Sequence, residues 1–220
     1  MSDKKQCLTI TDIDGELEAS RQVTHNAICI PNGINPEEMN EIIEQASKLT
    51  TKNHEKTTIC MLGKVVPQKN PELFNEIAKE FPSVGFCWIG AGPLEDKLNS
   101  ENIEITGWLP RIQATARIME SDIFLFPSAW ESLSIALMEV MYIGKPCVVS
   151  KADGNRDVIQ NGKNGFICED KEEYVQAISQ LLADKAMAES YGKQARQDIL
   201  DKYNVGVMEK AYRVLFKRIM

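Results

Sequence analysis

Residues 123–150, which read IFLFPSAWESLSIALMEVMYIGKPCVVS, decide the fold. The stretch opens with one apolar run, IFLF, and closes with another, CVVS, and both are typical of buried strands. Between them we expect a helix over residues 134–143, which Ser132 or Ser134 can cap and Gly144 ends. Because a strand, a helix and a strand follow one another closely, the stretch predicts a parallel βαβ unit.

The same alternation of short apolar runs and longer helical patterns extends along the chain from about residue 57. It predicts an α/β fold, a parallel sheet with helices on both faces. The expected strands are residues 57–62, 84–89, 103–106, 123–126, 147–150 and 166–168. The expected helices are residues 36–49, 71–80, 94–99, 112–120, 134–143, 155–160, 172–183, 185–202 and 205–219.

Composition and charge exclude several classes of function. The chain has 25 Lys and Arg against 32 Asp and Glu, a net charge of −7, which disfavours nucleic acid as a partner. No stretch approaches the ~18 apolar residues of a membrane span, and the polar start MSDKKQ does not resemble a signal peptide. A cytoplasmic protein is therefore expected. The six cysteines lie at least 21 residues apart, which excludes Cys-x-x-Cys metal and redox motifs.

Ligands of open α/β sheets bind outside the carboxyl ends of the strands, so the loops after the strands are the candidate sites. The first such loop, LGKVVPQKNPE, leaves a strand at Gly63 and carries Lys64 and Lys69 just before a helix begins. Two cations and a helix N-terminus suit an anion such as a diphosphate. Taken alone, the loop is also consistent with two surface lysines.

Glycines follow two other strands at the same edge. Gly90 and Gly92 lack the third glycine of a dinucleotide-binding fingerprint, which disfavours NAD. Gly154 adds backbone donors after the strand that ends at Ser150. Each of these loops can also be a tight turn that binds nothing.

Two carboxylates belong to the helix over residues 134–143. That helix is apolar on every side except at Glu139, so it is expected to be buried, and the carboxylate needs a hydrogen-bond partner. Glu131 precedes Glu139 by eight residues and stands at the mouth of the helix. The two carboxylates can grip two hydroxyl-bearing parts of one elongated ligand. The alternatives are a capping or solvated acid at 131 and a carboxylate at the helix edge at 139.

Taken together, these segments resemble the C-terminal half of GT-B glycosyltransferases of glycosyltransferase family 4, retaining enzymes with a Glu-x7-Glu motif. The match covers about residues 28–219 and implies a Rossmann-like parallel sheet. The order and spacing of its landmarks make the resemblance specific. These are CIPNGIN, LGKVVPQKNPELF, IGAGPLEDKL, ITGWLP, DIFLFPSAWESLSIALMEVMYIGKPCVVS, DGNRDVIQNGKNGFIC and the final helix.

The resemblance implies a role for each matched residue. Lys64 and Lys69 would bind the donor diphosphate, and Glu131, the third catalytic residue, would bind hydroxyls of the transferred sugar. Glu139 would bind the ribose hydroxyls, and the loop at 107–109 would cradle the base. The nucleotide-binding positions besides Glu139 would be Gly63, Gly90, Gly107, Trp108, Leu109, Leu133 and Ser134.

The chain departs from the family pattern at three places. Lys64 replaces the usual Arg, which keeps the charge and loses bidentate geometry. The triplet Ser132-Leu133-Ser134 stands where most relatives have Gly-Phe-Gly, which removes backbone freedom. Asp157 stands where many relatives carry Glu.

The family's reaction moves a glycosyl group from a UDP- or GDP-linked sugar to an acceptor hydroxyl with retention at the anomeric carbon. Surface polysaccharide or glycan synthesis is the expected setting. The resemblance implies no cofactor and no divalent metal. One Asp-x-Asp does occur, at Asp12 and Asp14, but Gly15 after it predicts a hairpin turn rather than a metal site.

A GT-B enzyme has two Rossmann-like domains, and the N-terminal one holds most of the acceptor. Here we expect an N-terminal segment and interdomain linker at 1–35, a nucleotide-sugar-binding domain at 36–204, and a C-terminal helix at 205–220 that contacts the missing N-terminal domain. Either the chain is a fragment of a longer enzyme, or another polypeptide supplies the acceptor half. Peripheral membrane association stays open, since it often depends on the absent half.

Two other functions are consistent with the sequence. A noncatalytic interaction subunit would keep the fold and use its exposed face for a partner, which the Ser-Leu-Ser departure and the missing domain favour. A sugar-nucleotide epimerase shares the two-domain architecture, but the Glu-x7-Glu spacing together with two lysines disfavours it.

Overall fold

The structure, a computed structural model, describes residues 8–24, 26–51 and 56–219. In these residues the main element is a parallel sheet of six strands in the order β5-β4-β3-β6-β7-β8. The predicted parallel sheet is confirmed, and each strand lies within one residue of its expected bounds. The strands are β3 (Thr58–Leu62), β4 (Gly85–Ile89), β5 (Ile103–Ile105), β6 (Ile123–Phe126), β7 (Cys147–Ser150) and β8 (Gly165–Cys168).

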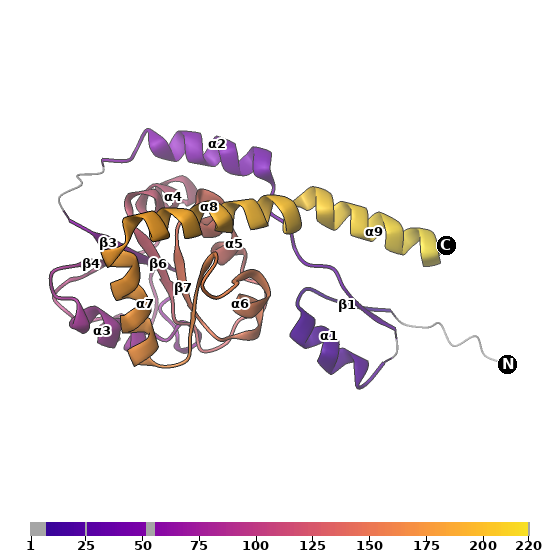
Figure 1. The fold of residues 1–220 in the computed structure, drawn as a ribbon, viewed down its shortest axis with the longest axis horizontal. Helices are drawn as coiled ribbons and strands as arrows, with labels where there is room; N and C mark the ends of the chain where they lie inside the picture. Colours follow the sequence, from indigo (N-terminus) through magenta and orange to yellow (C-terminus); the bar gives the residue numbers. More distant parts are fainter. Residues whose placement is uncertain (1–7, 25, 52–55, 220) are drawn as a thin grey trace.

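Helices cover both faces of this sheet. They are α2 (Pro36–Ser47), α3 (Pro71–Glu80), α4 (Arg111–Glu120), α5 (Ile135–Ile143), α6 (Asp153–Val158), α7 (Lys171–Ala183) and α8 (Lys185–Lys202). A further helix, α9 (Val205–Ile219), extends away from the sheet. On one face α4 and α5 pack with α2 and α8, and on the other α3 packs with α7 (Figure 1). None of the helices in the described ranges combines the length and the apolar character that crossing a membrane requires.

Two helices differ from the sequence prediction. The helix expected over 94–99 is only a short 3-10 turn, η2 (Glu95–Lys97), because the Leu94 N-cap offers no side-chain acceptor for the first N–H groups. The helix expected over 155–160 begins two residues earlier, as α6. Ser134 is the cap of α5, since its hydroxyl accepts from the Leu137 N–H, and Gly144 ends the helix with a φ of 89°.

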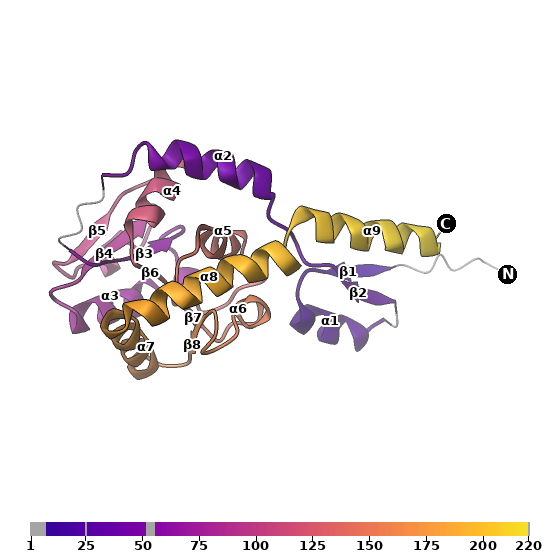
Figure 2. The ribbon, with the colours of Figure 1, turned by 45° about the horizontal axis from the view of Figure 1, so that its top comes forward.

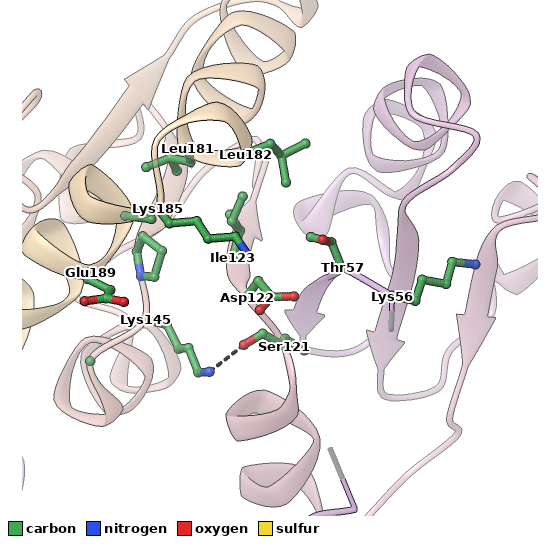
Figure 3. A pocket seen from close by; sticks show the side chains of 13 residues that line it. Lys56, Thr57, Ser121, Asp122, Ile123, Lys145, Leu181, Leu182, Lys185 and Glu189 are labelled. Atoms are coloured by element: carbon green, nitrogen blue, oxygen red, sulfur yellow. Dashed lines mark hydrogen bonds between the residues drawn. The ribbon is translucent and has the colours of Figure 1, made fainter. Parts of the chain in front are cut away.

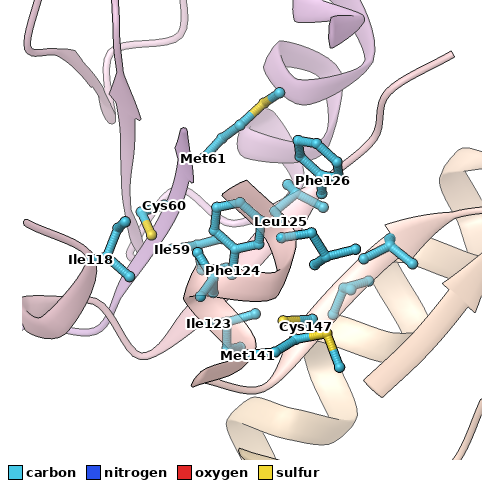
Figure 4. Packing of buried hydrophobic residues seen from close by; sticks show 14 of the residues in the cluster. Ile59, Cys60, Met61, Ile118, Ile123, Phe124, Leu125, Phe126, Met141 and Cys147 are labelled. Atoms are coloured by element: carbon cyan, nitrogen blue, oxygen red, sulfur yellow. The ribbon is translucent and has the colours of Figure 1, made fainter. Parts of the chain in front are cut away.

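The core is built on the central strands β3 and β6. The rings of Phe124 and Phe126 stack with their centroids 5.5 Å apart, and both side chains are fully buried. Figure 4 shows the apolar side chains of β3 and α5 gathered around these rings. The cysteines Cys60, Cys87, Cys147 and Cys168 are also buried and unpaired, Cys29 is partly exposed, and Cys7 lies outside the described residues.

The segment ahead of this sheet forms a small unit of its own. Strands β1 (Thr9–Thr11) and β2 (Ala27–Cys29) pair in parallel, and α1 (Asp14–Arg21) connects them. The hairpin turn predicted at residues 12–15 is therefore wrong. Parallel strands need a crossover rather than a hairpin, and two acidic residues in the first turn of α1, Asp14 and Glu16, favour a helix there.

The chain enters and leaves the large sheet at one point. The Ile34 N–H donates to the Tyr203 carbonyl at 2.8 Å, and the Val205 N–H donates to the Ile34 carbonyl at 2.9 Å. Gly33 lies so close to Asn204 that a Cβ would stand 2.4 Å from its carbonyl carbon. From this junction α9 extends toward the end of the molecule that holds β1, α1 and β2 (Figures 1 and 2).

The contact between α5 and α8 depends on the missing side chain of Gly192, because a Cβ there would lie 2.0 Å from the Gly144 carbonyl oxygen. We expect Gly192→Ala to lower the free energy of unfolding by about 2 kcal/mol, as overpacking does. Urea denaturation measures it. The control is Gly206→Ala near the exposed start of α9, where alanine gains up to about 1 kcal/mol of helix propensity. Unchanged stability of Gly192→Ala would contradict this packing.

Candidate active site

The candidate site lies where the strand order reverses. β3 is hydrogen-bonded to β4 on one side and to β6 on the other, so the chain winds outward in both directions from this pair. Ligands of such sheets bind at the carboxyl ends of the strands beside the reversal. Lys69 lies in the short helix η1 (Pro67–Lys69) after β3, and Glu131 lies in the loop after β6.

The two predicted catalytic side chains Lys69 and Glu131 form an ion pair. The Lys69 Nζ donates to the Glu131 Oε1, and the two side chains are only 16% and 6% exposed. The same Nζ lies 4.6 Å from the centre of the Phe126 ring. The Lys69 stem passes over Gly63, where a Cβ would stand 3.3 Å from its Cε. Three predicted positions, 63, 69 and 131, are therefore in one cluster.

Hydrogen bonds to backbone carbonyls join the loops that carry this pair. The Ala129 N–H donates to the Gln68 carbonyl at 2.8 Å, and the Gln68 Nε2 donates to the Trp130 carbonyl at 3.1 Å. A third loop joins them, since the Gly154 N–H donates to the Glu131 carbonyl at 3.1 Å. Sequence reasoning missed Gln68, because nothing in the local pattern shows which distant loop it bonds.

A cavity of about 530 Å³ opens beside this cluster. Trp108, 78% exposed, and the exposed Lys64 stand on its wall. Its floor needs a glycine at Gly90, because a Cβ there would lie 2.1 Å from the Gly63 carbonyl oxygen; a bridge pairs Gly90 with Gly107. The full lining is Leu62, Gly63, Lys64, Ile89, Gly90, Ala91, Gly92, Trp108, Leu109 and Ala114, so five predicted site residues line it.

The N-terminus of α5 offers free backbone donors next to Glu131. Leu133 is buried and Ser134 is partly exposed. Within the described part of the chain, the N–H groups of these two residues donate to no other group of the protein. Neither Ser132 nor Ser134 has a positive φ, so the backbone adopts this turn without needing glycine at either position.

Glu139 has the partner that its burial requires. Its side chain is 16% exposed, and the Arg111 Nη2 donates to its Oε1 at 2.6 Å. The prediction that this carboxylate needs a hydrogen-bond partner is confirmed. Arg111 itself was not among the predicted site residues. A cation 28 residues away on another helix has no spacing signal that would identify it.

The other acidic candidates, Asp157 and Asp12, bond residues of the N-terminal segment. The Asp157 Oδ2 accepts from the Asp14 N–H at 2.9 Å, at the start of α1, and burial raises the pKa of Asp157. The Asp12 Oδ2 accepts from the Asn32 Nδ2 at 3.1 Å. Among the residues that the structure describes, no three His, Cys, Asp or Glu side chains lie together as a set of metal ligands.

A second cavity of about 350 Å³ lies at the amino ends of the strands (Figure 3). Its lining includes Thr57, Asp122 and Pro146, which directly precede β3, β6 and β7. Lys145 faces it and donates to the carbonyls of Ser121 and Met119. The predicted site residues all follow their strands, so this cavity is not part of the candidate site.

Comparison with known proteins identifies the family. Residues 42–198 match the model of the family described as glycosyl transferases group 1. The chain belongs to this family. A UDP-Gal:alpha-D-GlcNAc-diphosphoundecaprenol alpha-1,3-galactosyltransferase of Escherichia coli is 28% identical over 80% of the chain and 50% of that relative. A sulfoquinovosyl transferase of Arabidopsis thaliana is 30% identical over 73% of the chain and 33% of that relative. The chain spans half or less of the length of each of these two relatives.

Solved structures share the fold. Sucrose-phosphate synthase of Thermosynechococcus elongatus superimposes with a TM-score of 0.83 at 16% identity, over 96% of this chain and 57% of that one. HepE of Anabaena, solved in complex with UDP-glucose, gives 0.81 at 18% identity, over 96% and 64%. The C-terminal domain of a group 1 glycosyl transferase of Francisella tularensis gives 0.64 at 18% identity, over 79% and 100%. The chain thus has the fold of one half of a GT-B glycosyltransferase, as the sequence predicts.

The Lys69–Glu131 pair is expected to contribute to stability as well as to the site. Lys69→Met leaves a shielded carboxylate unpaired, so we expect it to lower the free energy of unfolding by about 2–3 kcal/mol. Adding Glu131→Gln removes that charge and is expected to recover about 1 kcal/mol, measured as a double-mutant cycle in urea. The matched surface pair, Lys48 with Glu44, should couple by less than about 0.5 kcal/mol. Strictly additive losses at 69 and 131 would argue against the pair.

Proposed function

We propose that this chain is the donor-binding half of a retaining glycosyltransferase. It would move a hexose from a UDP- or GDP-linked donor to an acceptor hydroxyl in surface polysaccharide or glycan synthesis. The observation that carries the proposal is the shielded pair of Lys69 and Glu131 at the reversal of strand order, beside a cavity of about 530 Å³. The nucleotide sugar is a substrate, and the proposal requires no separate cofactor.

The diphosphate would bind between the Lys69 loop and the start of α5. One of the three Nζ hydrogens of Lys69 bonds Glu131, and the other two remain for phosphate oxygens. Lys64 adds a second cation from the cavity wall. The N–H groups of Leu133 and Ser134 stand just ahead of the first turn of α5, where the positive end of the helix dipole lies. These charges would stabilise the departing diphosphate, which is the main electrostatic demand of the reaction.

The transferred sugar and the ribose of the donor would bind the two carboxylates, and the base would bind in the cavity. Glu131 would hold hydroxyls of the transferred sugar and Glu139 those of the ribose. The base would lie against Trp108, whose exposed ring offers a flat apolar face on the cavity wall. No protein nucleophile is needed when catalysis comes from positioning and leaving-group stabilisation.

The acceptor would be held by an N-terminal domain or subunit that completes the β1-α1-β2 unit. Two-stranded sheets are marginal by themselves, and parallel sheets are normally buried on both faces. In the described residues β1 and β2 pair only with each other, which leaves hydrogen-bonding edges for further strands. Val207, Val214 and Phe216 on α9 are exposed and would add apolar surface to such a contact.

Calorimetric titration of the chain with UDP, GDP and ADP tests the donor site. We expect one diphosphate to bind preferentially, and Lys69→Ala to weaken its binding at least about tenfold, or ~1.4 kcal/mol. Lys64→Ala should weaken it less, because its ammonium is more exposed. Lys48→Ala, which removes an exposed lysine directly after α2, is the control. Absence of binding by the wild-type chain, with capture of a partner protein, would favour the noncatalytic subunit instead.

A further inference from the structure

Arg111 fixes a carboxylate that could otherwise turn in several directions. Glu139 is the one charged side chain of α5, whose sequence is IALMEVMYI. The Arg111 Nη2 bonds the Glu139 Oε1 at 2.6 Å. In the described residues the other oxygen, Oε2, has no protein partner. The carboxylate is thus held through one oxygen and can accept from a ligand through the other.

Arg111 is held in turn by α2. Its Nη1 donates to Glu38 in the first turn of α2, and its Nη2 lies 3.6 Å from the Met39 Sδ. α2 is fastened to α5, because the Tyr142 hydroxyl donates to the Asn40 Oδ1 at 2.9 Å. Residues of three helices, α4, α2 and α5, therefore meet at the guanidinium, although the Arg111 side chain stays 47% exposed. Its planar fork can serve two carboxylates at once, which a lysine ammonium on the same stem does poorly.

The helix that carries Arg111 begins at the wall of the candidate nucleotide cavity. Leu109 and Ala114 both line the cavity, and Arg111 lies between them in the chain, at the first position of α4. Arg111 does not line the cavity itself. Glu139 does not line it either, so the ion pair lies outside the cavity lining, and the carboxylate is 16% exposed.

We propose that Arg111 is a positioning residue for nucleotide binding, which orients the Glu139 carboxylate toward the ribose hydroxyls without touching the nucleotide. The inference rests on the proposed function, since it takes Glu139 as the ribose-binding side chain. It adds that ribose recognition depends on α4 and, through Glu38, on the helix that follows the interdomain linker.

The test compares two ligands that differ only at the ribose. UDP and 2′,3′-dideoxy-UDP, or the corresponding GDP or ADP pair if the wild type binds that base instead, are titrated into the full chain by calorimetry. The wild type is expected to bind the hydroxylated ligand at least about tenfold tighter, as charged hydrogen bonds provide. In Arg111→Ala this preference should fall below about threefold, while affinity for the dideoxy ligand stays within about twofold. Arg111→Lys should recover part of the preference.

Arg117→Ala is the matched control. Arg117 lies on the same helix and bridges Glu104 and Glu120, so it has the same chemistry away from the cavity. It should leave both affinities unchanged, and thermal melting confirms that each variant is folded.

Three outcomes would overturn the inference. If Arg111→Ala keeps the full preference for the hydroxylated ligand, Arg111 does not position Glu139. If it weakens both ligands equally, its role is structural only. If the wild type binds none of the three diphosphates, the proposed function fails first, and the inference fails with it.

Discussion

Three bonds between the loop after β3 and the loop after β6 hold the candidate site together. Gln68 supplies two of them, through its carbonyl and its side-chain amide, and Lys69 supplies the third to Glu131. The loops come from distant parts of the chain and meet only because β3 and β6 are neighbours in the sheet. Without that pairing the lysine and the carboxylate would each be a lone charge near the surface.

Close backbone approach is the second requirement of this arrangement. The turn at Gly90 passes against the Gly63 carbonyl, and a Cβ at Gly154 would lie 2.0 Å from the Ser132 carbonyl oxygen. Any side chain at these two glycines would push the loops apart. At Ser132 and Ser134 the backbone needs no such freedom, so serine is accommodated at both positions. The glycine requirement therefore lies in the neighbouring loops and not in the capping turn.

The strands and the site loops could be predicted from the sequence because both depend on the local sequence pattern. Apolar runs such as IFLF and CVVS mark strands, and the residues after them must meet at one sheet edge. The burial of Glu139 was also readable, since one acid stood in an apolar helix. Its partner Arg111 could not be predicted, because only the packing of α4 near α5 brings Arg111 to Glu139. The hairpin expected at residues 12–15 is wrong because β1 and β2 pair in parallel, which the local pattern does not show, and the Asp14 N–H at the start of α1 finds its acceptor far along the chain, in Asp157.

The candidate site is connected to the junction where the chain passes between the β1-α1-β2 unit and the six-stranded sheet. Ile34 bonds Tyr203 and Val205, so both crossings share one short ladder of backbone bonds. Two residues after Ile34 the helix α2 begins, and its Glu38 holds the arginine that holds Glu139. A displacement of α2 at this junction would reach the carboxylate through one guanidinium, with no flexible loop between them. Arg111, which bonds both Glu38 and Glu139, is therefore the side chain through which a movement of α2 would reach the Glu139 carboxylate.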